Sequence, residues 1–203
     1  MTRFPTALLL CLGLAACALS TGVATIDYEP QDGVVPDERA AAIGLQVSVR
    51  DAREVPRDWV GLKMSGWGTK EAPIYPDRDV LEILRDALTM ELTNRGYPLR
   101  SGGARVDIAL TWFNSKFRYG IPAADALAEV SFDATVFGET EDPFYSEQVT
   151  GLGENPNVLI MASDSAEVAL ERALATAVSQ LMADAAFIDA LKAAAGSVDA
   201  PGA

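Results

Sequence analysis

The chain has 203 residues, of which 49% are hydrophobic and 22% are charged, enough for one globular domain with a hydrophobic core. Lysine and arginine number 16 against 29 aspartate and glutamate residues, so the net charge is −13. Such an acidic surface repels phosphate backbones and anionic lipid headgroups. We therefore expect no nucleic-acid binding, which depends mainly on basic residues that displace counterions.

The first residues have the pattern of a lipoprotein signal peptide. Arg3 precedes an apolar run, residues 7–16, that is too short to span a bilayer and leads into Cys17. Residues 14–17, Leu-Ala-Ala-Cys, resemble a lipobox, in which the thiol receives diacylglycerol and the new amino group is acylated, as with palmitate. We predict that residues 1–16 are removed, which leaves a net charge of −14, and that Cys17 is lipidated. The alternative is a plain secretory signal that leaves Cys17 unmodified.

The residues that most often carry catalysis or bind metals are missing from the mature sequence. The two cysteines are Cys11, in the predicted signal peptide, and Cys17, and the chain has no histidine. The mature fold therefore lacks a disulfide, the commonest general base and the commonest zinc ligand. No serine is followed three positions later by lysine, and no phosphate-binding or calcium-binding loop pattern occurs. We expect no catalytic residue, no metal and no cofactor, and hence no enzyme.

Residues 17–43 are rich in proline, glycine and acidic residues, and they are predicted to form a lipidated N-terminus and tether. One stretch in this segment, residues 24–28, has the pattern of a short strand. Fully extended, a tether of about 25 residues would reach roughly 80 Å from the membrane. A single domain is then predicted over residues 44–195, followed by a disordered tail over 196–203.

The first half of the domain predicts one strand and one helix. Apolar and polar residues alternate over 45–50, which is the period of a half-buried strand. Residues 54–76 are rich in glycine and proline, and we expect no long regular element there. Residues 77–95 predict the clearest helix, with a capping box that begins at Asp79, a leucine stripe and a stop at Gly96.

The second half predicts three strands and a closing helix. Strand periodicity recurs over 105–113, 127–137 and 144–150, and the turn residues between the last two strands indicate a hairpin. Residues 164–195 then carry an apolar stripe at helical spacing. A helix of this length is unusual, so we expect a break near Asp184.

Asp164 and Glu167 have the spacing of a second capping box at the start of the closing helix. The order of elements is then β-α-β-β-β-α, which indicates an α+β fold. We predict a two-layer sandwich, in which a mostly antiparallel sheet of about four strands carries two helices on one face. The first two strands flank a helix, so they are expected to be parallel.

Four blocks of the sequence resemble the YajG family of uncharacterised bacterial lipoproteins. The blocks are the lipobox, the first strand with Val-Ser-Val-Arg-Asp-Ala-Arg at 47–53, the helix that runs into Asn-Arg-Gly-Tyr at 94–97, and the helical end at 181–191. The resemblance implies an outer-membrane lipoprotein that faces the periplasm, and Ala18 after the cysteine agrees with the usual sorting pattern for that membrane. The family implies no activity, cofactor or catalytic residue.

Asp51 and Arg53 leave the first predicted strand side by side. They could present a charged pair to a partner, or the arginine could pair with the aspartate and brace the loop that follows.

A change of face occurs near the end of the second predicted strand. The apolar residues on one face run as far as Trp112, and they then switch to Phe113, Phe117 and Tyr119. One explanation is a β-bulge, which exchanges the two faces and keeps these side chains in the core. The other is that the strand extends beyond the helices and presents a binding surface to a glycan or a protein. The candidate binding residues are Trp59, Trp67, Phe117, Arg118 and Tyr119.

These observations predict a lipid-anchored, non-enzymatic binding or adaptor module of the outer membrane, with an envelope protein as its partner. Two alternatives are a peptidoglycan-contacting protein and an auxiliary lipoprotein of an envelope transport system.

Overall fold

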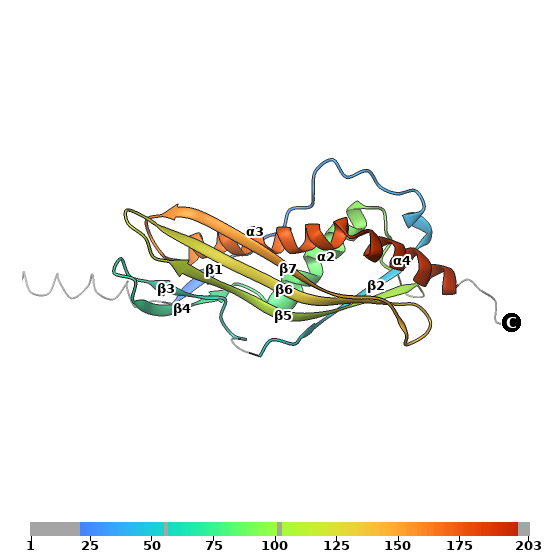
Figure 1. Cartoon of the computed structure of the whole chain (residues 1–203), viewed down its shortest axis with the longest axis horizontal. Helices are drawn as coiled ribbons and strands as arrows, with labels where there is room; N and C mark the ends of the chain where they lie inside the picture. Colours follow the sequence, from blue (N-terminus) through green and yellow to red (C-terminus); the bar gives the residue numbers. More distant parts are fainter. Residues whose placement is uncertain (1–20, 55–56, 101–102, 199–203) are drawn as a thin grey trace, which may run out of the picture.

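Four long strands form the main sheet of the molecule (Figure 1). The computed structural model describes residues 21–54, 57–100 and 103–198, and in these the main sheet has the order β2-β5-β6-β7. β2 and β5 are parallel, and the other pairs are antiparallel, as the sequence predicts. The strands are β2 (Leu45–Asp51), β5 (Ala104–Arg118), β6 (Ala124–Phe137) and β7 (Pro143–Val158).

A second sheet, with the order β1-β4-β3, lies beside one end of the main sheet (Figure 1). Its strands are β1 (Gly22–Ala24), β3 (Gly61–Met64) and β4 (Lys70–Pro76). Residues 54–76, where the sequence predicts no long regular element, therefore contain two short strands, β3 and β4. The prolines that indicated a loop are accommodated because β1 pairs only with residues 74–76, so Pro73 has a strand neighbour on one side alone.

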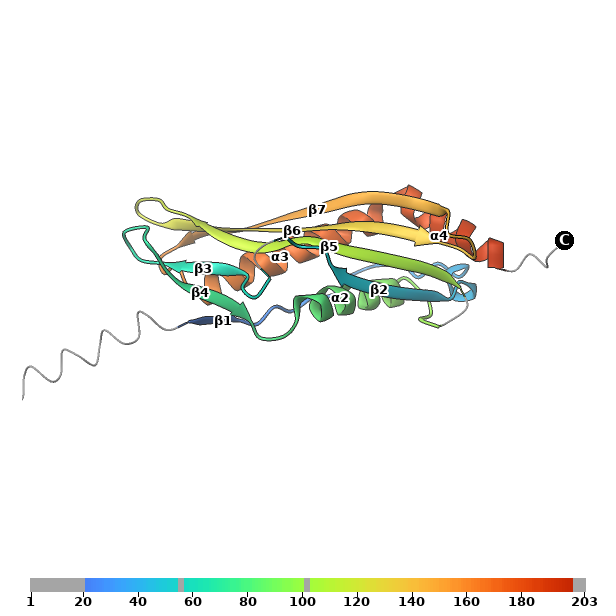
Figure 2. The same ribbon diagram turned by 90° about the horizontal axis from the view of Figure 1, so that it is seen from below.

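Three α-helices pack against the buried face of the main sheet (Figure 2). They are α2 (Val80–Asn94), α3 (Ser163–Ala183) and α4 (Ala185–Val198), and a short 3-10 turn, η1 (Ala40–Ala42), precedes β2. The α+β class is confirmed, but the predicted single sheet with two helices is incomplete, since the described residues form two sheets and three α-helices.

The helix ends test the predicted signals. Asp79 is the N-cap of α2 and its side chain accepts a hydrogen bond from the Leu81 amide, as predicted. The predicted break is also confirmed, because α3 ends at Ala183 and α4 turns away by 60° after Asp184. The capping box at Asp164 is wrong: α3 has no side-chain cap, and the Glu167 carboxylate accepts instead from the Thr25 amide.

The helix α3 lies unusually close to β7. A Cβ atom on Gly151 would lie 2.1 Å from the Ala173 carbonyl oxygen, and one on Gly153 would lie 2.0 Å from the Ala169 carbonyl oxygen. The two glycines thus allow the backbones of helix and strand to approach closely, with alanines at the contact.

Residues 22–43 cross the helix layer and are part of the folded body, in contrast to the tether predicted over 17–43. Ala24 and Ile26 are fully buried, and the Tyr28 hydroxyl donates to the carboxylate of Glu91, which is itself completely buried. The backbone amide of Gln31 donates a hydrogen bond to the same carboxylate oxygen, and Nη2 of Arg95 lies 3.1 Å from the other oxygen. We call residues 25–31 the strap.

At its two ends, the described part of the chain begins at residue 21 and stops at residue 198. The predicted signal peptide, with Cys17, lies outside the described residues, as do residues 199–203. Of the predicted disordered tail, residues 196–198 belong to α4.

Candidate functional site

A β-bulge in β5 changes which of its residues point to the covered face of the main sheet and which to the open face. The register between β5 and β6 shifts between Leu110, which faces Phe132, and Trp112, which faces Ser131. The predicted bulge is therefore confirmed, and it keeps Phe113 in the core. The expectation that Trp112 shares the buried face with the residues before it is wrong, because Trp112 is 38% exposed on the open face.

The open face carries a hollow of about 450 Å³ across β5, β6 and β7. Its apolar side chains come from all three strands: Trp112, Leu127 and Leu152. Leu152, in the middle of β7, is 65% exposed beside Trp112, which is 38% exposed. The hollow is therefore an exposed apolar patch on a sheet face that no described helix covers.

Polar groups form the rim of the hollow: Asn114, Lys116, Glu129 and Glu154. Strand pairing places Asn114 beside Glu129, and Lys116 beside Leu127. At one side the Ser131 hydroxyl lies 2.9 Å from the Thr150 hydroxyl and donates to Glu129. A rim of this kind can orient a ligand through hydrogen bonds while the apolar centre supplies contact area.

Arg118 forms an ion pair with Glu154, one of the residues that line the hollow, and a second with Asp125. Its Nη2 atom lies 2.7 Å from the Asp125 carboxylate and 3.0 Å from that of Glu154. The hydrogen bond to Asp125 raises the pKa of Arg118, and in return Arg118, helped by the Asn157 amide, lowers the pKa of Asp125. The guanidinium is thus already paired within the protein.

The structure separates the five predicted binding residues. Phe117 is a core residue, only 8% exposed, and Trp59 is half-buried, with its carbonyl accepting from the Asn114 side chain. Trp67, in the turn between β3 and β4, and Tyr119, directly after β5, are exposed, and neither lines the hollow. The side chains that line the hollow were missed because the sequence reading placed Trp112 in the core and ended the fourth strand before Leu152.

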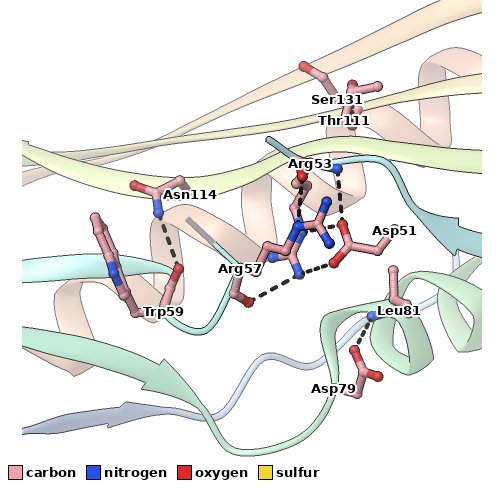
Figure 3. A network of polar contacts seen from close by, with 9 residues as sticks. All are labelled: Asp51, Arg53, Arg57, Trp59, Asp79, Leu81, Thr111, Asn114 and Ser131. Carbon is pink, nitrogen blue, oxygen red and sulfur yellow. Dashed lines mark hydrogen bonds and ion pairs between the residues drawn. The ribbon is translucent and has the colours of Figure 1, made fainter. Parts of the chain in front are cut away.

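Asp51 and Arg53 form the buried brace rather than an exposed charged pair (Figure 3). The Arg53 side chain donates two hydrogen bonds of 2.9 Å to the two oxygens of Asp51, and a third to the Arg57 carbonyl. Arg53 is 4% exposed, and its hydrogen bonds lower the pKa of Asp51. This network holds the chain as it leaves β2, and the Val60 carbonyl then accepts from the Ser115 amide at the edge of β5.

Metal sites and membrane-spanning helices are two other kinds of feature to consider in the part of the chain that the structure describes. Among the described residues, no group of three or more cysteine, aspartate or glutamate side chains could hold a metal ion. Within the same part of the chain, no single helix is long and apolar enough to cross a bilayer, and the pair α3 and α4 meets the length and composition test only together, across its bend.

Comparisons with known proteins identify the family and the fold. A family model described as an uncharacterized lipoprotein matches residues 30–192, and this is the YajG family. A solved structure of a protein from Xanthomonas campestris, of the DUF330 family, has a TM-score of 0.56 and 14% identity over 88% of this chain and 99% of its own. A second, of an uncharacterized protein, has a TM-score of 0.33 and 12% identity over 63% of this chain and 79% of its own. None of the curated proteins compared with the sequence matches it.

Proposed function

Because the chain belongs to the YajG family of uncharacterized lipoproteins, we propose that it is a non-enzymatic binding or adaptor module, held by lipid on Cys17 at the periplasmic face of the outer membrane. The anchor would act by confining the domain near its partner, which raises the effective concentration of the two without a new contact. The domain would supply one recognition surface.

The open face of the main sheet is the recognition surface in this proposal. The observation that carries it is the exposure of Trp112 and Leu152 over a hollow on a face that no described helix covers. Tryptophan at the centre of an apolar patch with a polar rim is typical of protein interfaces, where it provides much of the binding energy. An envelope protein that lays an apolar side chain into the hollow is the partner that this surface fits best.

Site-specific photocrosslinking tests the surface directly. A photoreactive amino acid at Leu152 should capture one dominant protein from intact envelopes, to be identified by mass spectrometry. The matched position is Asp189, which is exposed on α4 at the covered side. Equal capture from both positions would contradict the proposal.

Truncation of the patch provides the second test. The double variant with Trp112→Ala and Leu152→Ala should fold but lose the captured partner in affinity purification. Met90→Ala removes an exposed apolar side chain from α2 and should retain it. If the double variant and Met90→Ala recover equal amounts of the partner, the recognition surface does not lie on the open face.

The anchor has its own test. Replacement of Cys17 by alanine should release the protein from the membrane fraction, and continued fractionation with membranes would show that lipid on Cys17 is not the anchor. Separation of inner from outer membranes by density would then place the wild-type protein in one of them.

A peptidoglycan ligand is the second candidate, and one observation favours it. An indole face beside the Asn114 amide and the Glu129 carboxylate also suits a sugar ring, which stacks on aromatic side chains and hydrogen-bonds at its edge. Sedimentation with purified sacculi distinguishes the two: retention that depends on Trp112 would favour the cell wall over a protein partner.

A further inference from the structure

One end of the molecule carries four large apolar side chains that are almost fully exposed. Trp67, in the β3–β4 turn, is 91% exposed, and Ile121, in the β5–β6 turn, is 86% exposed. Leu159 and Ile160, in the connection from β7 to α3, are 82% and 74% exposed. We call these four residues the apolar tips.

The three connections that carry the apolar tips lie together. A Cβ atom on Gly68, next to Trp67, would lie 3.5 Å from the ring of Tyr119, which precedes the β5–β6 turn. The Met64 amide donates to the Met161 carbonyl, so β3 also adjoins the β7–α3 connection. Figures 1 and 2 show from two directions that the three connections share one end of the molecule.

The chain also enters the fold at this end. A Cβ atom on Gly22, the first residue of β1, would lie 3.2 Å from Cβ of Ser163 at the start of α3 and 3.4 Å from the Lys63 side chain. Cys17 is five residues before Gly22, a span of at most about 18 Å when fully extended. In the proposed function, lipid on Cys17 would therefore hold this end of the domain, rather than the opposite end, near the bilayer surface.

The charge of this end differs from that of the chain as a whole. The segments 61–72, 116–126 and 154–165 contain four basic and four acidic residues, whereas the mature chain has a net charge of −14. The end that carries the apolar tips thus lacks the negative charge that would repel an anionic membrane surface. The charged residues in these segments are Lys63, Lys70, Lys116, Arg118, Glu71, Asp125, Glu154 and Asp164.

We propose that the apolar tips insert into the interfacial region of the bilayer that holds the lipid on Cys17, so that the domain stands with this end on the membrane. The inference rests on the lipid anchor in the proposed function and adds a second, direct contact with the bilayer. Tryptophan and tyrosine favour this region because it accepts both their apolar rings and their polar N–H or O–H groups. Large aliphatic side chains are stabilised there by the burial of apolar surface. The β6–β7 turn, at the opposite end, then faces away from the membrane.

Tryptophan fluorescence in vesicles with brominated lipids tests the contact. The full lipidated protein, reconstituted into vesicles of phosphatidylethanolamine and phosphatidylglycerol, is compared in two forms. Trp59→Phe with Trp112→Phe leaves Trp67 as the single tryptophan, and Trp59→Phe with Trp67→Phe leaves Trp112. The emission of Trp67 should shift to shorter wavelength and lose intensity to the bromine atoms, whereas that of Trp112 should change little.

A second pair of positions makes the test independent of Trp67. In a protein without the three native tryptophans, Ile121→Trp should be quenched by the brominated lipids. Phe144→Trp, at the exposed start of β7 near the opposite end, should not be quenched. Equal quenching of the two members of either pair would overturn the proposal.

Flotation of the same vesicles separates this inference from the anchor on which it rests. Protein that floats with the vesicles while its tip tryptophans stay unquenched would leave the lipid anchor standing and overturn insertion. Protein that does not float would show that the anchor itself is wrong, and the proposed insertion would fall with it.

Discussion

The two faces of the main sheet differ in how closely they are packed and in how far their apolar side chains are exposed. On the covered face, the residues where β7 meets α3 are glycine and alanine. The backbones of β7 and α3 are so close there that a Cβ atom on either strand glycine would not fit. On the open face of the same strand, Leu152 stands in solvent between those two glycines. The comparison indicates that close packing on the covered face stabilises the fold, whereas exposed side chains on the open face contribute little to stability.

The largest expected effect lies in the covered layer, at the buried carboxylate of Glu91. Glu91→Ala would leave the Tyr28 hydroxyl and the Gln31 backbone amide without their acceptor, and Arg95 without its ion-pair partner. It should cost about 3 to 5 kcal/mol of unfolding free energy. Urea denaturation measures the loss. Glu82→Ala, at an exposed position in the same helix, should cost at most about 1 kcal/mol. Similar losses in both variants would contradict a special role for the strap.

The contact of β7 with α3 is the next test of the comparison. Gly153→Ala would place a methyl group 2.0 Å from the Ala169 carbonyl oxygen, so the helix must shift, at a cost of about 1 to 3 kcal/mol. Gly66→Ala adds the same methyl group where no atom lies within 4 Å and should be neutral. The melting temperatures of the two variants report the difference, and a neutral Gly153→Ala would mean that the layers are loosely packed.

A smaller effect with a pH dependence is expected at the joint between α3 and α4. Asp184 accepts from the Tyr145 hydroxyl and from the Ala186 amide, both at 2.8 Å. Its loss in Asp184→Ala should cost about 1 to 2 kcal/mol at neutral pH. Asp184→Asn keeps an acceptor for the helix cap and should lose less.

The sign of the pH dependence follows from the same contacts. The hydrogen bond from the Tyr145 hydroxyl lowers the pKa of Asp184, because it stabilises the ionised carboxylate in the folded state. The unfolded state has no such hydrogen bond. This contribution is fully present above the unfolded pKa of about 4 and is lost as the pH falls through the lower folded value. The difference in unfolding free energy between wild type and Asp184→Ala, measured by urea denaturation, should therefore become smaller below about pH 4. A difference that does not change with pH would show that the ionised carboxylate does not contribute.

The smallest effect on stability is expected on the open face. Leu152→Ser should change the unfolding free energy by no more than about 0.5 kcal/mol, because the side chain is already in solvent. Val149→Ser, three residues earlier on the covered face, should cost about 2 kcal/mol or more. Comparable losses at the two positions would show that the faces are not energetically distinct.

The sequence predicted most of the main sheet and the helix α2 because alternation of apolar and polar residues marks the strands, and capping and stop residues mark the helix ends. Alternation of apolar and polar residues marked β2 and β6, and Asp79 with Gly96 bounded α2. The parallel pairing of β2 with β5 followed from the helix between them. These signals are local, and each depends on residues within one element.

What the sequence did not predict depends on contacts between distant segments. β1 and β4 are short and contain glycine or proline, and they are strands because they pair with each other across about fifty residues. The strap resembled a tether because the acceptors that bind it, on α2 and α3, are remote in the sequence. The sequence indicated a bulge near the end of this strand but placed Trp112 before it, on the buried face. The bulge lies at Thr111, and this difference of one residue puts Trp112 on the open face.

The parallel pairing of β1 with β4 also determines how the domain responds to a mechanical load. Force applied at Cys17 enters the fold along β1 and acts on its hydrogen bonds to β4 in shear, so the bonds bear the load together. The strap continues the same path, with the carboxylates of Glu167, Glu171 and Glu91 as successive points of attachment. In the proposed arrangement, a pull between the lipid anchor and a partner on the open face would thus act first on the second sheet and the strap, and only then on the main sheet.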